Sequence, residues 1–275
     1  MAVARDKFWL FGVRPHQDDG LLYGDWERRR ADGGLAVSRM TPAEAAAVLD
    51  VPNVMMIGCQ GEPAVFGEDA YGYAESFCRM KKVYWSSTGS GGFRTGAEDR
   101  FICDLAEKYP NVCGTFMDDY YNEYRDDPDG VAKAAEKLRV IHENLGKACR
   151  PIEKIVSWVW QDEPHPELMR YIDGLTLWTW KSTSLYKLPG RFEELKAKIP
   201  DKKIYLGIYL YDFYHYKPVP LDLMEFQCEL GLQWLKEGRI DGMVFETNST
   251  MGVRLPSELW LRDWIQRVKD TEIPD

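Results

Sequence analysis

The chain alternates eight times between a short apolar run and a polar or glycine-rich stretch that leads to an amphipathic helical segment in most cases. Strands that alternate with helices build parallel sheets. The chain has no G-x-G-x-x-G or G-x-x-x-x-G-K-[ST] phosphate-binding motif, which favours a closed barrel over an open sheet. The apolar runs begin near Phe8, Val54, Val83, Val112, Ile155, Leu175, Ile204 and Met243. We therefore predict a single (β/α)8 barrel domain over residues 1–275, a length that this fold reaches as one domain.

Helix signals support this prediction. Thr41-Pro42-Ala43-Glu44 combines an N-cap residue, a proline at the first helical position and a capping-box acid. Residues 130–149 place apolar side chains on one helical stripe, namely Ala134, Leu138, Ile141 and Leu145. Residues 220–238 and 256–269 predict two further helices, and we expect the last one to close the barrel.

The composition of the chain narrows the kinds of molecule that it could bind. The net charge of −9 and the pI of about 5.1 argue against binding to nucleic acid. No segment approaches the roughly 18 apolar residues of a membrane span, and the N-terminus lacks the apolar core of a signal peptide. None of the six cysteines lies in a C-x-x-C pair, so we expect buried free thiols in a cytoplasmic protein. The oligomeric state is left open.

The carboxyl ends of barrel strands converge on one mouth, where enzymes with this fold carry their active sites. Asp118 and Asp119 follow the predicted strand that begins at Val112, and Glu246 ends the apolar run that begins at Met243. Apolar strand residues need burial, whereas ionised carboxylates need water, partners or a substrate. We predict that Asp118, Asp119 and Glu246 are the catalytic residues.

Aromatic, histidine and amide side chains also gather at the predicted strand ends. Aromatic rings offer flat apolar faces to the C–H surface of a sugar, while amides, carboxylates and hydroxyls bind its hydroxyl groups. The predicted substrate is therefore a small carbohydrate. The predicted substrate-binding residues are Arg14, His16, Trp85, Asn122, Trp158, Trp160, Trp178, Trp180, Tyr209, Tyr211, His215 and Asn248.

Strand parity predicts which of these side chains point inward. In the strand that begins at Ile204, aliphatic residues alternate with Tyr205, Gly207, Tyr209 and Tyr211, so the tyrosines should enter the barrel. The same logic turns Trp178 and Trp180 inward and gives Asp212 the wrong parity for a catalyst. The strands that precede Asp118 and Glu246 are apolar on both faces, and their parity is not settled by sequence.

We predict neither a cofactor nor a metal. His16, His215 and Asp118 are the residues that could converge on a divalent ion, but no H-x-H or H-E-x-x-H spacing supports such a site. The glycine-rich segment Thr88–Gly92 lacks the lysine of a phosphate-binding loop, so we interpret it as a flexible loop. No G-x-S-x-G motif of a serine hydrolase is present.

The strand–helix plan resembles the catalytic barrels of glycoside hydrolases. Within it, Phe116-Met117-Asp118-Asp119 resembles the aspartate pair of the substrate-assisted N-acetylhexosaminidases. That resemblance implies that Asp118 polarises the acetamido group of the substrate and that Asp119 is the general acid. It also implies that Trp178 and Tyr209 form an aromatic box around the acetamido group.

The predicted function is that of a glycoside hydrolase that acts on a small glycoside or oligosaccharide. Two alternatives use the same barrel. The first is a sugar isomerase, epimerase or lyase with His16 or His215 as the base, with or without the assistance of a metal. The second is a barrel that binds carbohydrate without turning it over.

Overall fold

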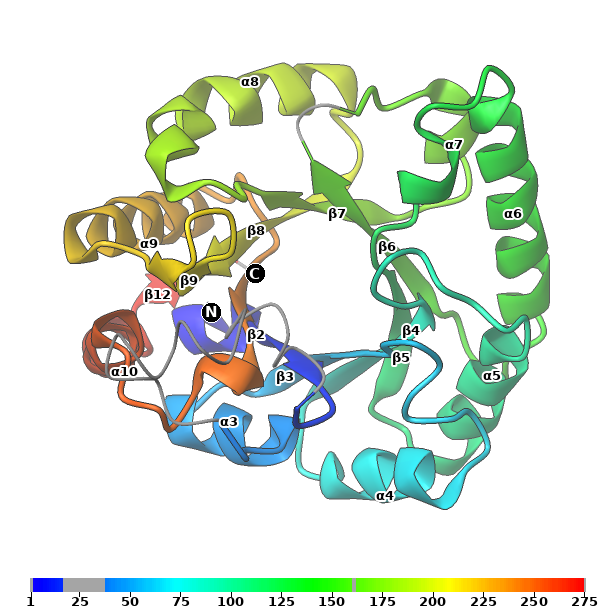
Figure 1. Ribbon diagram of the computed structural model, residues 1–275, viewed down its shortest axis with the longest axis horizontal. Coiled ribbons are helices and arrows are strands. Elements are labelled where there is room, and N and C mark those ends of the chain that lie inside the picture. Colours follow the sequence, from blue (N-terminus) through cyan, green and yellow to red (C-terminus); the bar gives the residue numbers. More distant parts are fainter. Residues whose placement is uncertain (1, 17–37, 160–161, 275) are drawn as a thin grey trace.

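A computed structural model of the chain describes residues 2–16, 38–159 and 162–274 (Figure 1). Its centre is a closed barrel of parallel strands in the order β11-β2-β3-β4-β5-β6-β7-β8. Each predicted apolar run coincides with one of these strands, and the predicted (β/α)8 barrel is confirmed. The barrel strands are β2 (Phe8–Val13), β3 (Asn53–Ile57), β4 (Lys82–Thr88), β5 (Val112–Met117), β6 (Glu153–Val159), β7 (Gly174–Trp178), β8 (Lys203–Tyr209) and β11 (Gly242–Glu246).

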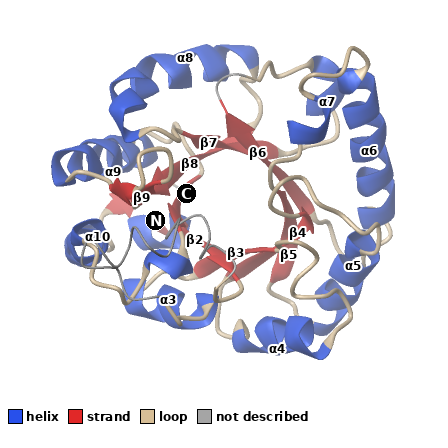
Figure 2. Ribbon diagram, in the orientation of Figure 1, coloured by secondary structure: helices blue, strands red, loops and turns tan. Residues whose placement is uncertain are grey.

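Helices surround the barrel as an outer ring (Figure 2). The last of them, α10, packs against both α9 and α3 and thereby closes the ring, as predicted. In the described part of the chain, no helix is long and apolar enough to cross a membrane. The helices are α3 (Pro42–Leu49), α4 (Glu68–Ser76), α5 (Glu98–Lys108), α6 (Gly130–Leu145), α7 (Pro166–Met169), α8 (Leu188–Lys198), α9 (Leu221–Lys236) and α10 (Pro256–Val268).

Short elements complete the two ends of the barrel. At the amino end, an antiparallel pair of two-residue strands joins the two termini of the chain. At the carboxyl end, a small hairpin follows β8 and 3-10 turns follow β5, β7 and β11. These elements are β1 (Ala2–Val3), β12 (Glu272–Ile273), η1 (Ala4–Lys7), η2 (Asn122–Tyr124), η3 (Ser182–Lys187), β9 (Tyr211–Asp212), β10 (Lys217–Pro218) and η4 (Asn248–Thr250).

The capping box predicted at Thr41 and the apolar stripe predicted for residues 130–149 both form in the structure. The Thr41 side chain accepts a hydrogen bond from the Glu44 backbone N–H, and the Glu44 carboxylate accepts one from the Thr41 N–H at 2.8 Å. This reciprocal cap satisfies donors that the first turn of α3 leaves without helical partners. The predicted apolar stripe of α6 is fully buried, although the helix ends at Leu145 rather than at Cys149.

Aromatic rings fill the barrel interior. Trp9, Phe11, Tyr84, Phe116 and Trp178 belong to one buried cluster that also contains aliphatic side chains from four strands. The rings contact one another edge to face or tilted, with centroids 4.4 Å apart for Trp9 and Tyr84 and 5.9 Å apart for Phe11 and Trp178. Such offset contacts stabilise beyond the area that they bury. The barrel is therefore a packed core with its open face at the strand ends.

A glycine makes room for the uppermost of these rings. A Cβ atom at Gly207 of β8 would lie 2.0 Å from Cε3 of Trp178 on the adjacent strand β7. The indole therefore lies flat against the bare backbone of β8. Any larger residue at position 207 would push Trp178 out of the interior.

The burial of the cysteines differs from the prediction of buried free thiols. Only Cys228 is fully buried, whereas Cys78 and Cys149 are exposed at the ends of their helical segments. The prediction that the thiols are buried is therefore wrong for these two. Both lie in the turns that follow α4 and α6 rather than within the helices.

Candidate active site

The strand parity of two candidate carboxylates is settled by their neighbours. Phe116 of β5 and Val244 of β11 both lie in the interior cluster. Successive side chains of a strand alternate between its two faces, so Glu246, the last residue of β11, follows the inward parity of Val244. Asp118 lies one residue beyond the end of β5, but its N–H still donates to the Thr88 carbonyl of β4 at 3.0 Å, which continues the strand pairing and keeps Asp118 in the inward parity of Phe116. Asp118 is 8% exposed, and Glu246 is half-buried. Both carboxylates are thus directed to the mouth of the barrel.

Glu246 lies next to Tyr209, because the two are register partners on the adjacent strands β11 and β8. Burial, followed by the negative charges of Glu246, Asp118 and Asp119, raises the pKa of Tyr209 well above its ordinary value. Electrostatic influence of this kind requires that the groups lie close to one another. The structure therefore brings together four residues that the sequence placed on three different strands.

The backbone turns at Asp119, which allows both adjacent aspartates to serve one site. Asp119 has a φ of 44°, in the left-handed region that residues other than glycine rarely adopt. Its carbonyl accepts a hydrogen bond from the Asn122 N–H at 3.0 Å, and its Oδ2 accepts one from the Gly91 N–H at 2.9 Å. Non-glycine residues in this conformation cluster at functional sites. In a continuous strand the two side chains would instead point to opposite faces.

The glycine-rich segment at the end of β4 holds this turn, a role that its interpretation as a flexible loop did not include. Gly92 has a φ of 76°, and a Cβ atom there would lie 3.0 Å from the Asp119 carbonyl oxygen. The backbone of the segment thus packs directly on the aspartate turn. A glycine pair that follows a predicted strand was the available sequence signal for this role.

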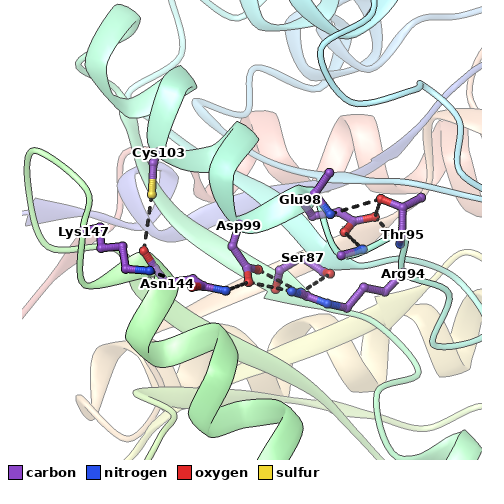
Figure 3. A network of polar contacts seen from close by, with 10 residues as sticks. Ser87, Arg94, Thr95, Glu98, Asp99, Cys103, Asn144 and Lys147 are labelled. Atoms are coloured by element: carbon purple, nitrogen blue, oxygen red, sulfur yellow. Dashed lines mark hydrogen bonds and ion pairs between the residues drawn. The ribbon is translucent and has the colours of Figure 1, made fainter.

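The far end of the same segment is anchored by a polar network (Figure 3). Arg94 forms a two-pronged ion pair with the buried carboxylate of Asp99 on α5, at 2.8 and 2.5 Å, and donates to the Ser87 carbonyl oxygen. Asn144 of α6 donates to the same carboxylate at 3.0 Å. A bidentate pair with its remaining lone pairs satisfied holds a fixed geometry. The loop that positions Asp119 is therefore tied to two helices.

Trp178 and Tyr209 form an aromatic floor at the base of the mouth, and the prediction that both side chains point inward is confirmed. Their ring centroids are 4.9 Å apart at an interplanar angle of 50°. The Trp178 indole N–H donates to Thr176 Oγ1 at 2.7 Å, which fixes the orientation of the ring. A buried hydroxyl and a rigid ring thus lie side by side at the base of the mouth.

Two other tryptophans were wrongly predicted to line the mouth. Trp85 packs against Phe101 of α5 with centroids 5.5 Å apart, and Trp158 lies in the same outer core between sheet and helices. Trp85 follows the inward-facing Tyr84, and Trp158 pairs in register with the outward-facing Leu177. Both therefore have outward parity and contribute to stability rather than to a site.

Asn248 is a structural residue, which corrects its assignment as a substrate ligand. Its side chain is 0% exposed and bonds to the Val13 N–H at 2.7 Å, the Val13 carbonyl at 3.0 Å and the Met40 carbonyl at 2.9 Å. These contacts join the ends of β2 and β11. With its amide committed to the backbone, Asn248 has no free group for a sugar hydroxyl.

Tyr211 lies outside the barrel interior, contrary to the prediction from parity. β8 ends at Tyr209, and the chain then enters the β9–β10 hairpin, where Tyr211 is buried with Phe213 and Leu255. Parity no longer applies once the strand has ended. The conclusion that Asp212 is no direct catalyst still agrees with its position, because its side chain is 0% exposed.

Asp212 instead joins the loops after β7 and β8. Its carboxylate accepts hydrogen bonds from the Ser182 N–H and hydroxyl and from the backbone N–H groups of Tyr214 and His215. It also bonds to Nδ1 of His215 at 2.8 Å. Burial alone would raise the pKa of Asp212, but these hydrogen bonds outweigh it and hold that pKa below its ordinary value. Strand parity argued against Asp212 as a catalyst, but its role in joining the two loops was not predicted.

The remaining predicted residues lie in different surroundings. Arg14 and His16 line a hollow of about 550 Å³ between the end of β2 and α4, and none of the three carboxylates lines it. Asn122 and Trp180 are exposed, and His215 presents a third of its side chain to solvent. Trp160 lies outside the described residues. Within the described ranges, no three His, Cys, Asp or Glu side chains gather as a metal site requires.

Neither a family model nor a curated protein sequence matches the chain. Solved structures are similar to it in fold. The GH99 endo-alpha-mannosidase from Bacteroides thetaiotaomicron superposes with a TM-score of 0.57 at 10% identity, over 96% of this chain and 97% of that chain. YKL-39, solved in the presence of chitooligosaccharides, superposes with a TM-score of 0.55 at 12% identity, over 97% and 100%. The chain therefore has a (β/α)8 fold of the kind found in glycoside hydrolases; identities this low show the fold alone.

Proposed function

We propose that this protein is a glycoside hydrolase that acts on a small glycoside or oligosaccharide. One observation carries the proposal: Glu246 is the register partner of Tyr209 at the mouth of the barrel, and the charges of Asp118, Asp119 and Glu246 all act on the phenol of Tyr209. Glycoside hydrolysis needs two carboxyl groups, or one beside a substrate group that takes the place of the second. The aromatic floor of Trp178 and Tyr209 beneath them suits the apolar face of a sugar ring.

Asp119 is the proposed general acid. The Gly91 N–H occupies its Oδ2, which leaves Oδ1 to carry a proton and deliver it to the glycosidic oxygen. The left-handed turn and the anchored loop after β4 hold this carboxyl group in place. A positioned acid needs such support, because small displacements weaken proton transfer in the transition state.

The second carboxylate distinguishes two mechanisms. If Asp118 acts, it orients an acetamido group of the substrate, which then attacks the anomeric carbon, and the substrate is an N-acetylhexosaminide. If Glu246 acts, it is the nucleophile or the base that activates water. Asp118 is the more buried of the two and lies beside Asp119, which supports the first mechanism.

The test is turnover of a panel of aryl glycosides, including the N-acetylglucosaminide, by the wild type and by Asp118→Asn and Asp119→Asn. We expect Asp119→Asn to lose about 10²–10⁴-fold in kcat on substrates with poor leaving groups. The loss should shrink on dinitrophenyl glycosides, because their leaving group needs no proton. Asp118→Asn should lose activity on N-acetylated substrates above all.

Glu163→Gln is the matched control. Its carboxylate follows β6 but pairs with Lys198 on the surface, so its removal should leave turnover unchanged. Circular dichroism of each variant checks that folding is intact. Wild-type activity of Asp119→Asn on poor leaving groups would remove Asp119 from the chemistry.

A second function, a sugar isomerase, epimerase or lyase, is favoured by one observation. The buried carboxylate of Asp212 binds Nδ1 of His215, which leaves Nε2 free to act as an acid or base. Proton exchange at a sugar carbon, measured in deuterated water and lost in His215→Gln, would support this function. Aryl glycoside hydrolysis that survives His215→Gln would support the hydrolase instead.

A further inference from the structure

Two exposed aromatic side chains lie on the neighbouring loops after β7 and β8. Trp180 is 51% exposed and Tyr214 is 53% exposed. The ammonium group of Lys181 lies 3.5 Å from the centroid of the Tyr214 ring, so the two loops are in direct contact. The hairpin that leads to Tyr214 lies beside the end of β8 in Figure 1. Large rings left in water on touching loops are unusual for a feature that serves stability alone.

The loops that carry these rings are rigidly joined. Asp212 binds the Ser182 backbone and hydroxyl on the β7 side and the Tyr214 and His215 backbones on the β8 side. A buried carboxylate with this many donors ties both segments to one position. The exposed rings are therefore preorganised, which lowers the entropy lost when a ligand binds to them.

The loops that carry these rings begin at the ends of the strands that form the aromatic floor. Trp180 is two residues beyond Trp178, a span of at most about 7 Å of extended chain. On the other strand, Tyr209 contacts Phe213 with ring centroids 5.6 Å apart, and Phe213 precedes Tyr214. A sugar unit above Trp178 and Tyr209 thus has these exposed rings within reach of the next unit of the same chain.

We propose that Trp180, Lys181, Tyr214 and His215 form an outer sugar-binding subsite, and that the natural ligand is an oligosaccharide of at least two units. This inference rests on the proposed function for its inner subsite. The Trp180 ring supplies a flat face for the C–H surface of the outer sugar. The Lys181 ammonium and Nε2 of His215 bind its hydroxyl groups, while Lys181 covers one face of Tyr214.

The first experiment measures KM along chitooligosaccharide and mannooligosaccharide ladders of one to six units. For the wild type, we expect affinity to rise about tenfold, or more, between one unit and the longer chains. Trp180→Ala and Tyr214→Ala should lose that gain, and circular dichroism checks that each variant is folded. Trp180→Phe should restore part of it, because a smaller flat ring remains.

Phe226→Ala on α9 is the matched control, since it also removes an exposed ring, but one that lies on a helix of the outer ring rather than on the loops after β7 and β8. It should keep the wild-type dependence on chain length. The same dependence in Trp180→Ala and Tyr214→Ala would overturn the subsite.

Binding measured by calorimetry on the same ladders separates this inference from the hydrolase proposal. If no glycoside is turned over, affinity that rises with chain length and is lost in Trp180→Ala still supports the subsite, although the hydrolase proposal has failed. If glycosides are turned over but neither KM nor affinity depends on chain length in any ladder, the outer subsite is wrong and the hydrolase proposal stands.

Discussion

Glu246 and Tyr209 are register partners on the adjacent strands β11 and β8, so their side chains leave the sheet on the same face, toward the mouth of the barrel. This pairing places a carboxylate next to a buried phenol. Burial first, and then the charges of Glu246, Asp118 and Asp119, raise the pKa of Tyr209 well above its ordinary value. The raised pKa favours the protonated phenol, which can donate a hydrogen bond to a substrate at neutral pH.

The first prediction concerns the titration of Tyr209. Below a pH of about 10 the phenol is neutral in both folded and unfolded chains, and above it the unfolded chain ionises first. Because the pKa of Tyr209 is raised in the folded chain, the folding stability linked to it is fully present below a pH of about 10 and is lost as the pH rises toward the folded pKa. We expect the wild type and Tyr209→Phe to show equal tyrosinate absorbance up to a pH of about 11. A smaller absorbance change in Tyr209→Phe would show that Tyr209 titrates normally.

The second prediction concerns Glu246. If this residue is the second carboxylate, Glu246→Gln keeps the shape of the side chain but should lower kcat by about 10²–10⁴-fold. The anomer released by the wild type, read by nuclear magnetic resonance, then separates retention from inversion. Glu237→Gln, which alters an exposed carboxylate paired with Arg239, is the control. Full activity of Glu246→Gln on an N-acetylhexosaminide would leave Asp118 as the partner of Asp119.

The third prediction concerns the barrel interior. Gly207→Ala would place a methyl group 2.0 Å from the Trp178 ring, and we expect it to lower the free energy of unfolding by about 1–3 kcal/mol or more. Gly72→Ala on α4 meets nothing within 4 Å and should instead raise it by about 0.5–1 kcal/mol. Urea unfolding measures both. Adding Trp178→Leu to Gly207→Ala should cost less than the sum of the two changes, because the smaller side chain relieves the clash; strict additivity would contradict this packing.

The fourth prediction concerns Asn248. Asn248→Ala removes the side chain that joins Val13 to Met40 and leaves buried backbone groups without partners, which should cost about 1–3 kcal/mol of unfolding free energy. Ligand affinity of the variant, measured where it is still folded, should match the wild type. Unchanged stability together with weakened binding would return Asn248 to the set of substrate ligands.

Much of the fold was predictable because the signals are local. A period of two in β8 and a capping box at Thr41 each depend on residues that are close in sequence, and the structure confirms both. The positions of Trp178 and Tyr209 followed in the same way from alternation within single strands. The wrong assignments of Trp85 and Trp158 arose where strands are apolar on both faces, so that alternation carries no information.

The sequence by itself determined the order of strands and helices, the end of the barrel that carries the carboxylates and the identity of the aromatic floor, since hydrophobic periodicity acts within each element. Only the tertiary structure decided that Asp118 and Glu246 point inward, that the loop after β4 holds Asp119, and that Asn248 binds Val13 across a separation of 235 residues. The physical reason is that a hydrogen bond or a charge interaction depends on distance in space. Barrel closure alone brings the ends of distant strands within that distance.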